Sequence, residues 1–203
     1  MKNNKYLISE IFYSLQGEGS FTGTAMIFVR FHGCNLNCEW CDTKYSLQGP
    51  LTQMTIEEII QEVQDLSGDN YRVCLTGGEP FFNRDLAPLI VSLQDLGYII
   101  HAESNGTIYT EDMKLIDHLT ISPKKQSKVD ERSLKVADEV KVVLELDDLA
   151  YPLQFDTKDT TLADLYVQPE GNKSETIQSA IKFVKENPLW KLSLQTHKMI
   201  SIR

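Results

Sequence analysis

The chain has 203 residues, 20 basic and 29 acidic, which gives a formal net charge of −9. With 41% hydrophobic and 24% charged residues it has the composition of a globular protein, which excludes disordered, collagen-like and coiled-coil chains. The acidic balance argues against nucleic acid as the main partner, because binding a phosphate backbone requires clustered lysines and arginines. No stretch is apolar for the roughly 18 residues of a membrane span, and the N-terminus lacks a signal-peptide core. We therefore expect a cytoplasmic protein with no membrane partner, folded as one domain over residues 1–203.

The first half of the chain predicts two strand–helix units. A short apolar run over 25–30 indicates a buried strand that leads into a cysteine-rich loop. A helix begins at Thr55, because Thr55 and Glu58 form a capping-box pattern and apolar residues follow at helical spacing. A second strand is expected over 73–76, and a helix over 85–96 that a glycine terminates.

The same alternation continues to the end of the chain. Further strands are expected over 98–102, 119–122, 140–144, 165–168 and 191–195, and further helices over 110–117, 147–155 and 174–186. Strands that alternate with helices indicate βαβ units and a parallel sheet. Ligands of such sheets bind at the carboxyl ends of the strands. The unusual segments of this chain stand at those ends, namely the cysteine loop, 77–80, 103–106, 122–124 and 168–171.

Three of the four cysteines lie within eight residues, as Cys34-x-x-x-Cys38-x-x-Cys41. A tight thiol cluster in a reducing compartment indicates metal binding or redox chemistry rather than disulfides. Structural zinc takes four ligands, usually from two separated pairs, and the nearby His32 is equally consistent with packing or hydrogen bonding. An iron–sulfur cluster normally takes four thiolates, so three would leave one iron open. Cys74 stands alone in a predicted strand and fits a small buried residue.

The cysteine loop and one further motif resemble the radical S-adenosylmethionine (SAM) superfamily. Trp40 precedes the last cysteine, and Gly-Gly-Glu-Pro at 77–80 resembles the glycine-rich SAM motif of that superfamily. The resemblance implies a [4Fe–4S] cluster whose open iron binds SAM, and a radical that takes hydrogen from a substrate. Glycines without a Cβ would let a backbone carbonyl approach the SAM ammonium closely. The implied fold is α/β, an incomplete and open (β/α) barrel, since a complete eight-unit barrel typically needs about 250 residues.

Three other segments narrow the resemblance to the 7-carboxy-7-deazaguanine synthase family. They are Ser-Leu-Gln-Gly-Glu-Gly at 14–19 with Phe-Val-Arg at 28–30, Asp-Thr at 42–43, and Ser-Leu-Gln-Thr-His-Lys at 193–198. The resemblance covers nearly the whole chain. It implies a lyase that converts 6-carboxy-5,6,7,8-tetrahydropterin to 7-carboxy-7-deazaguanine with loss of ammonia, in queuosine and 7-deazapurine biosynthesis. SAM would be used catalytically, with Mg²⁺ assisting.

The family resemblance also implies site residues, none of them a catalytic acid or base. Substrate binding is implied for Leu15, Gln16, Gly17, Glu18, Arg30, Thr76 and His197. SAM binding is implied for Trp40, Cys41, Asp42, Gly78, Glu103, Ser104, Ser122, Pro123, Lys124 and Gln168. The metal ligands would be Cys34, Cys38 and Cys41 for the cluster and Thr43 for Mg²⁺.

Elementary chemistry supports several of these roles without excluding plainer ones. An amide at Gln16 and a carboxylate at Glu18 can recognise the amide and guanidine-like edges of a pterin. Arg30 suits a substrate carboxylate because guanidinium binds carboxylate through paired hydrogen bonds. Residues 14–19 are also compatible with a plain surface turn, Arg30 with a surface arginine, Glu103 with a solvated loop carboxylate, and His197 with a structural histidine.

Two rival functions share part of this pattern. A glycyl-radical-enzyme activase, acting on a protein partner, would carry the cysteine loop and Gly-Gly-Glu-Pro but has no need of Leu-Gln-Gly-Glu-Gly. A non-catalytic zinc or iron–sulfur protein would make the glycines and the polar strand ends coincidental. As partners of the synthase we expect a small-molecule pterin, an electron donor such as flavodoxin or ferredoxin, and a second copy in a homodimer. The polar segment 124–137 suggests no role.

Overall fold

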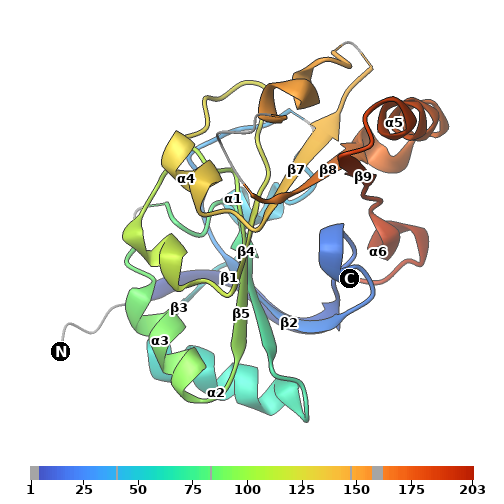
Figure 1. Ribbon diagram of the computed structural model, residues 1–203. Helices are drawn as coiled ribbons and strands as arrows, with labels where there is room; N and C mark the ends of the chain where they lie inside the picture. Colours follow the sequence, from blue (N-terminus) through green and yellow to red (C-terminus); the bar gives the residue numbers. More distant parts are fainter. Residues whose placement is uncertain (1–4, 40, 83, 147, 157–161) are drawn as a thin grey trace. The chain divides into compact units, whose positions relative to one another are not determined.

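The computed structural model describes residues 5–39, 41–82, 84–146, 148–156 and 162–203 (Figure 1). These residues form two compact units. The first unit contains the chain up to Ser14 together with 25–104 and 108–119, and the second contains 15–24, 105–107 and 120–203. Each unit is α/β. Among the described residues, no helix combines the length and the apolar character needed to cross a bilayer.

The first unit is built on strands in the order β3-β1-β2-β4-β5. Their bounds are β1 Tyr6–Leu15, β2 Ala25–Phe31, β3 Thr52–Met54, β4 Arg72–Gly77 and β5 Ile99–Ser104. β2, β4 and β5 pair in parallel, whereas β3 runs antiparallel to β1. The helical segments are α1 Tyr45–Gln48, α2 Ile56–Ser67, α3 Ala87–Asp95 and the 3₁₀ turn η2 Glu111–Leu115.

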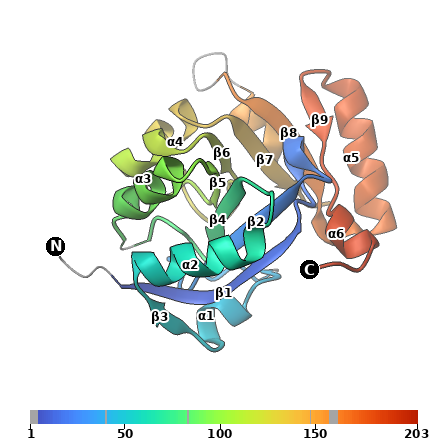
Figure 2. The same ribbon diagram turned by 90° about the horizontal axis from the view of Figure 1, so that it is seen from below.

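The two long helices of the first unit lie side by side, α2 against β2 and α3 against β5 (Figure 2). The predicted capping box is present at α2: the Glu58 N–H donates to Thr55 Oγ1 at 3.3 Å, and the Thr55 N–H donates to Glu58 Oε2 at 2.7 Å. α2 buries Ile59 and Val63 completely. Gly97 follows α3 with φ +89°, the left-handed conformation that favours glycine after a helix.

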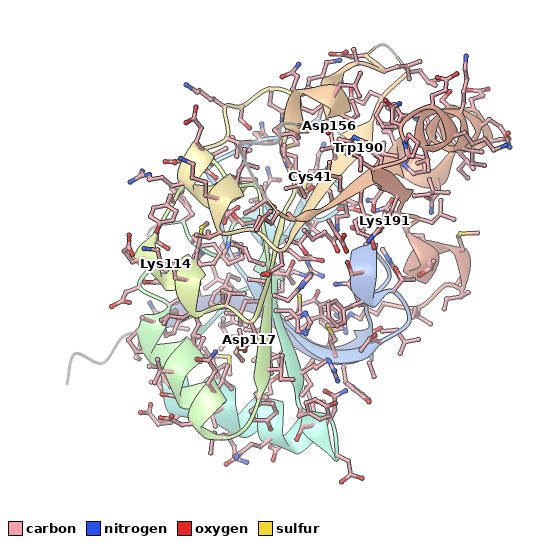
Figure 3. All side chains as sticks on the ribbon, in the orientation of Figure 1. Cys41, Lys114, Asp117, Asp156, Trp190 and Lys191 are labelled. Carbon is pink, nitrogen blue, oxygen red and sulfur yellow. The ribbon has the colours of Figure 1, made fainter. Side chains whose placement is uncertain are left out.

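The second unit is built on four parallel strands in the order β6-β7-β8-β9. Their bounds are β6 His118–Ile121, β7 Glu139–Leu144, β8 Asp164–Pro169 and β9 Trp190–Leu192. The helices are α4 Glu131–Lys135, α5 Ser174–Glu186 and α6 Thr196–Met199, with 3₁₀ turns η1 Gly19–Phe21, η3 Tyr151–Phe155 and η4 Glu170–Asn172. α5 packs on β8 and β9, where Phe183 meets the buried Trp190 edge to face at 5.5 Å. Trp190 is labelled in Figure 3.

Most predicted strands and the helix over 174–186 are confirmed to within two residues. The predicted helix over 110–117 is wrong in type, because only a 3₁₀ turn forms there. Asp117 serves the sheet instead: its N–H donates to Ile100 O and its carboxylate accepts from the Ile100 N–H at 2.8 Å (Figure 3). The helix expected over 147–155 is also a 3₁₀ turn in its described part, with Pro152 in the first turn.

The last predicted strand, over 191–195, stops at Leu192. The Ser193 N–H still donates to Val167 O of β8 at 2.9 Å, and beyond it the side chains of Ser193 and Gln195 hydrogen-bond the loop at 16–19. Among the described helices and strands, five were not predicted: α1, α4, α6, β1 and β3. β1 was not predicted because Ser9 and Glu10 interrupt the apolar alternation in the middle of the strand.

Candidate active site

The cysteine loop begins where β2 ends. Cys38 is buried, and Cys34 and Cys41, the latter visible in Figure 3, are partly exposed. All four cysteines of the chain are thiols. Burial raises the pKa of the Cys34 thiol, the Leu36 N–H opposes this by donating to Sγ at 3.4 Å, and the neighbouring Glu79, Cys38 and Cys41 raise the pKa further. The three loop thiols therefore lie within electrostatic reach of one another.

The donor set fits an iron–sulfur cluster by its chemistry, since three soft thiols share one short loop. Among the described residues, no three His, Cys, Asp or Glu side chains converge as metal ligands. His32 lies against Ser9, with 3.2 Å between Nδ1 and Oγ, which agrees with a hydrogen-bonding histidine. Because the Cys34 thiol, whose pKa is raised, must lose its proton to bind a metal, cluster binding by this loop would release a proton.

The Gly-Gly-Glu-Pro segment packs directly on the first residues of the cysteine loop. The Gly78 N–H donates to Phe31 O at 3.2 Å and the Glu79 N–H donates to Gly33 O at 3.0 Å. A Cβ on Gly78 would stand 2.3 Å from Gly33 O, and one on Gly77, whose φ is +131°, would stand 2.2 Å from Phe31 O. Both positions exclude a side chain, because the backbone at the end of β2 passes Gly77 and the start of the cysteine loop passes Gly78. This is a second reason for glycine besides the expected approach to SAM.

Glu79 and Arg84 hold this turn in place, and neither role was predicted from the sequence. Glu79 is fully buried, and its carboxylate accepts from Ser104 Oγ at 2.9 Å and from the Phe81 N–H at 3.2 Å. The Arg84 guanidinium donates to Glu79 O at 2.6 Å and to His32 O. Arg84 thereby ties the Gly-Gly-Glu-Pro turn to the residue that precedes the cysteine loop.

Two predicted site residues meet across β4 and β5. Thr76 Oγ1 donates to Glu103 Oε2 at 2.8 Å. Glu103 lies within β5, so the solvated-loop interpretation is wrong for this residue. Asp42 is exposed on the cysteine loop, and Thr43 Oγ1 lies 3.6 Å from Cys41 Sγ. Trp40 lies outside the described residues.

Arg30, on β2, is not a surface arginine. Its Nε donates to Glu10 Oε1 at 2.8 Å, and the two side chains are 12% and 14% exposed. The guanidinium carbon lies 5.5 Å from the centre of the Phe12 ring, which itself stacks on Phe28 at 5.1 Å. Ion pair and aromatic face together fix the direction of the guanidinium.

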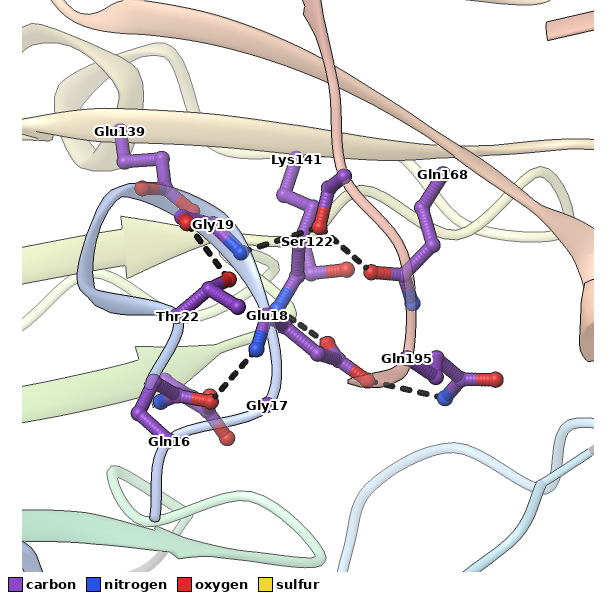
Figure 4. Close-up of polar contacts among 12 residues, drawn as sticks. Gln16, Gly17, Glu18, Gly19, Thr22, Ser122, Glu139, Lys141, Gln168 and Gln195 are labelled. Atoms are coloured by element: carbon purple, nitrogen blue, oxygen red, sulfur yellow. Dashed lines mark hydrogen bonds and ion pairs between the residues drawn. The ribbon is translucent and has the colours of Figure 1, made fainter. Parts of the chain in front are cut away.

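In the second unit, the loop over 15–24 is held by residues 195–197 (Figure 4 shows the contact from Gln195). Gly17 O accepts from the Thr196 N–H at 2.9 Å and from Thr196 Oγ1 at 3.0 Å. A Cβ on Gly17 would stand 2.0 Å from His197 Nδ1, so the loop and His197 touch. Gln16 Oε1 accepts from the Glu18 N–H at 3.1 Å. The plain surface turn considered for 14–19 is therefore wrong for this loop, which is built into the unit.

Glu18 is the most strongly held residue of this loop. Its carboxylate pairs with Lys141 of β7 and accepts from Gln195 Nε2 at 2.8 Å (Figure 4). Burial acts to raise the pKa of Glu18, but the Lys141 charge, the hydrogen bonds from Lys141 and Gln195, and His197 outweigh it and lower the pKa to about 2. Glu18 is thus a carboxylate at neutral pH.

The neighbouring residues of the loop are fixed by a second set of contacts. The N–H and Oγ of Ser20 donate to Glu139 Oε2 at 2.8 and 2.7 Å. The Gly19 N–H donates to Ser193 Oγ, and Ser193 Oγ donates to Gln168 Oε1 at 3.0 Å. Gln168, expected at the SAM site, is therefore connected to the loop. Ser122 accepts from Lys124 Nζ at 2.7 Å, directly after β6, with the buried Pro123 between them.

Four further residues surround this loop and were not predicted from the sequence to do so: Glu139, Lys141, Ser193 and Gln195. The available signal was a glutamate and a lysine at alternate positions of an otherwise apolar strand. Both point where an apolar residue is expected, and both are buried.

The α/β fold, the cysteine loop and the glycine-rich turn define a radical SAM protein, and the Radical SAM superfamily matches residues 28–124. The 7-carboxy-7-deazaguanine synthase of Bacteroides thetaiotaomicron is 42% identical over 97% of this chain and 98% of that protein. That of Haemophilus influenzae is 34% identical over 96% and 93%. The crystal structure of QueE from Escherichia coli matches with a TM-score of 0.81 at 28% identity, over 94% of this chain and 93% of that one. The chain belongs to the 7-carboxy-7-deazaguanine synthase family.

These comparisons confirm the predicted α/β fold of the open radical SAM barrel type. They also favour the synthase over the activase, because the similarity runs through the whole chain and includes the loop over 14–19. Membership in the radical SAM superfamily implies a [4Fe–4S] cluster and SAM as cofactors.

Proposed function

We propose that the chain is a radical SAM carbon–nitrogen lyase that contracts 6-carboxy-5,6,7,8-tetrahydropterin to 7-carboxy-7-deazaguanine with loss of ammonia. The observation that supports this proposal most is the 42% identity to a 7-carboxy-7-deazaguanine synthase over nearly the full length of both chains. When bound, the cluster and SAM supply the radical that takes hydrogen from the substrate, and SAM is used catalytically. The product belongs to 7-deazapurine and queuosine biosynthesis.

The cofactors would be held largely by the first unit. Cys34, Cys38 and Cys41 would bind the cluster. Gly78, Glu103 and Ser104 would contact SAM, and the remaining SAM contacts would come from Trp40, Cys41, Asp42, Ser122, Pro123, Lys124 and Gln168. The Thr76–Glu103 hydrogen bond supports this assignment, because it fixes the direction of a carboxylate suited to ribose hydroxyls.

The substrate would be recognised by charge and by hydrogen bonds. Arg30 would bind the substrate carboxylate, and its held guanidinium suits that task. Glu18, ionised at neutral pH, would accept hydrogen bonds from the guanidine-like edge of the pterin. The remaining contacts would come from Leu15, Gln16, Gly17, Thr76 and His197.

A decisive assay is anaerobic. Reconstituted protein would be given dithionite, SAM and 6-carboxy-5,6,7,8-tetrahydropterin, and mass spectrometry would follow 7-carboxy-7-deazaguanine. We expect product in molar excess over SAM consumed, since SAM is regenerated at each turnover. SAM cleavage without this product would contradict the proposed function and return the activase hypothesis to consideration.

Mg²⁺ is proposed to bind at Thr43. A single hydroxyl is a weak ligand, so the ion should bind well only when the substrate adds further oxygens. After chelator treatment, wild-type product formation should depend on added Mg²⁺, and Thr43→Ala should need a higher concentration while keeping its cluster absorption. Full wild-type activity without a divalent cation would contradict the site. An unchanged Mg²⁺ curve in the variant would move the site elsewhere, with Asp42 the next residue to test.

We also propose a compartment, an electron donor and an oligomeric state for the enzyme. The enzyme would work in the cytoplasm as one domain over residues 1–203, with flavodoxin or ferredoxin as electron donor. A homodimer would cover exposed apolar side chains such as Leu189, which is 70% exposed. Sedimentation of the reconstituted protein tests the dimer directly.

A further inference from the structure

Strand β7 carries two buried charges on one face. Glu139 is 2% exposed and Lys141 is 5% exposed. Because side chains alternate along a strand, residues two apart point to the same side. Both side chains reach the loop over 15–24, Glu139 to Ser20 and Lys141 to Glu18 (Figure 4).

Burying these charges is unfavourable unless each is compensated. Removing an ion from water costs several kcal/mol, and a hydrophobic residue of similar size is often as stable as a buried ion pair. An apolar β7 would have sufficed for the core, since Val140, Val142 and Leu144 already fill it. The lysine at 141 is therefore better explained by what it does to Glu18 than by stability.

The contacts of Glu18 show what that effect is. Lys141 engages one carboxylate oxygen and Gln195 the other, at 2.8 Å. Gln195 is itself held, because its carbonyl accepts from Asn172 Nδ2 at 3.0 Å and its Oε1 accepts from Lys198 Nζ at 2.9 Å. With both oxygens engaged, the plane of the carboxylate is set before any ligand arrives.

We propose that Lys141 is a positioning residue for substrate recognition, which holds Glu18 as an oriented carboxylate for the guanidine-like edge of the pterin. This inference rests on the proposed function. Lys141 acts through Glu18 and need not touch the substrate. Preorganisation of this kind improves affinity because the ordering cost is met in the free protein.

The titratable and charged groups around Glu18 decide how its pH response is interpreted. Lys141 faces it from β7, His197 lies near it on α6, Lys198 contacts it through Gln195, and Glu139 stands two residues from Lys141 on the same face. Without Lys141, burial raises the pKa of Glu18, so protonation moves toward the assay range. Groups other than Glu18 are the same in every variant, so only the difference between variants reports on Glu18.

The test measures substrate affinity apart from chemistry. Equilibrium binding of 6-carboxy-5,6,7,8-tetrahydropterin to the reconstituted, unreduced enzyme would be followed from pH 8 to pH 5.5 for wild type, Lys141→Met and Lys141→Arg. We expect Lys141→Met to bind about tenfold or more weakly, as for loss of one charge-assisted hydrogen bond. The loss should grow as pH falls, and arginine should restore part of it. Reductive SAM cleavage without substrate should be unchanged.

Lys191→Met is the matched control. Lys191 is a lysine of the same unit, on β9 (labelled in Figure 3). Its half-exposed ion pair with Asp164 at 2.7 Å does not involve Glu18, and within the network its charge acts on Glu139. Its removal should leave substrate affinity at the wild-type value.

A double-mutant cycle covers the case in which Lys141→Met alone fails to fold. Glu18→Gln with Lys141→Met carries neither buried charge, and it should bind substrate as weakly as Glu18→Gln alone. Wild-type affinity and pH response in Lys141→Met would overturn the inference, as would a double variant tenfold weaker than Glu18→Gln. If wild type neither binds nor converts the pterin, the proposed function itself fails.

Discussion

The four cysteines occupy two different environments. Cys74 is fully buried in β4, in register with Phe28 and His101 on the neighbouring strands, whereas the other three lie together on the loop after β2. Replacing any one loop cysteine by alanine should abolish the cluster and SAM cleavage, because in the proposed site each would supply one thiolate ligand. Cys74→Ala should keep both at a cost of about 1 kcal/mol in stability.

Iron and sulfide analysis, visible absorption and thermal unfolding would check this. We expect Cys74→Ala to contain as much iron as the wild-type protein, and each variant of a loop cysteine to contain none. A requirement for Cys74, combined with a dispensable loop cysteine, would contradict the assignment of the cluster ligands.

A substitution of Arg30 tests the proposed contact between this residue and the substrate carboxylate. Lysine keeps the charge but loses the fork that binds a carboxylate through two hydrogen bonds. Arg30→Lys should therefore raise KM for the pterin about tenfold, while SAM cleavage without substrate stays near wild type. Arg72→Lys is a suitable control, because Arg72 stacks on Tyr71 at the opposite end of a neighbouring strand. Equal loss of both activities in Arg30→Lys would place the arginine in the fold or the SAM site.

Elements with local signals could be predicted from the sequence, and elements without them could not. α2 has a capping box and an apolar face, and both are encoded within a dozen residues. β1 and β3 have no such signal: β3 is three residues long, and it is defined by pairing with β1 across about 45 residues of sequence. The 3₁₀ turn at η2 replaces a predicted helix because Asp117 is taken by the backbone of β5.

In the candidate site, too, features with a local sequence signal could be predicted and features that arise only on folding could not. Its motifs could be recognised because cluster and SAM chemistry require particular residues at fixed spacing. The partners of those residues could not, because Glu18 meets Lys141 and Gln195 only through the folded unit. Glu79 lay inside a recognised motif, but its buried hydrogen bond to Ser104 depends on how β4 and β5 pair.

The turn after β4 gives a prediction at the scale of elements. A Cβ on Gly78 would stand 2.3 Å from Gly33 O and 2.9 Å from Cys34 Cβ. Both neighbours belong to the start of the cysteine loop, so Gly78→Ala must displace that loop at a cost of about 1–3 kcal/mol. We expect the variant to fold with a lower melting temperature and to assemble less than the full cluster.

Gly68→Ala separates this clash from the general effect of replacing glycine. Gly68 ends α2 with φ +51°, and nothing lies within 4 Å of its would-be Cβ. That variant should lose some stability through backbone strain yet bind wild-type amounts of iron. Wild-type iron content in Gly78→Ala would show that the loop tolerates displacement.

Acid stability is a property of the whole molecule, in which many carboxylates titrate together. Two of them have strongly lowered pKa values. Hydrogen bonds from Lys141 and Gln195 and the charge of Lys141 overcome burial at Glu18, and the Arg132 side chain and N–H lower the pKa of Asp130 to about 2. Asp130 lies at the surface, where solvent screens its interactions, so it should contribute little. Glu18 is enclosed, and it should dominate any difference that single substitutions reveal.

Glu18 has a pKa of about 2 in the folded protein against an ordinary value of 4.5. Its ionised form therefore stabilises the fold fully above about pH 4.5, and this stabilisation, on the order of 3 kcal/mol, disappears as pH falls toward 2. Unfolding free energies of wild type and Glu18→Gln, measured by urea between pH 7 and pH 2, should differ most at neutral pH and converge at the acid end. Because acid release of a bound cluster would affect both proteins alike, the difference isolates Glu18. Asp130→Asn, which keeps a good N-cap for α4, should track wild type throughout. A gap between wild type and Glu18→Gln that stays constant down to pH 2 would show that packing, and not the ionised pair with Lys141, is what Glu18 contributes to the fold.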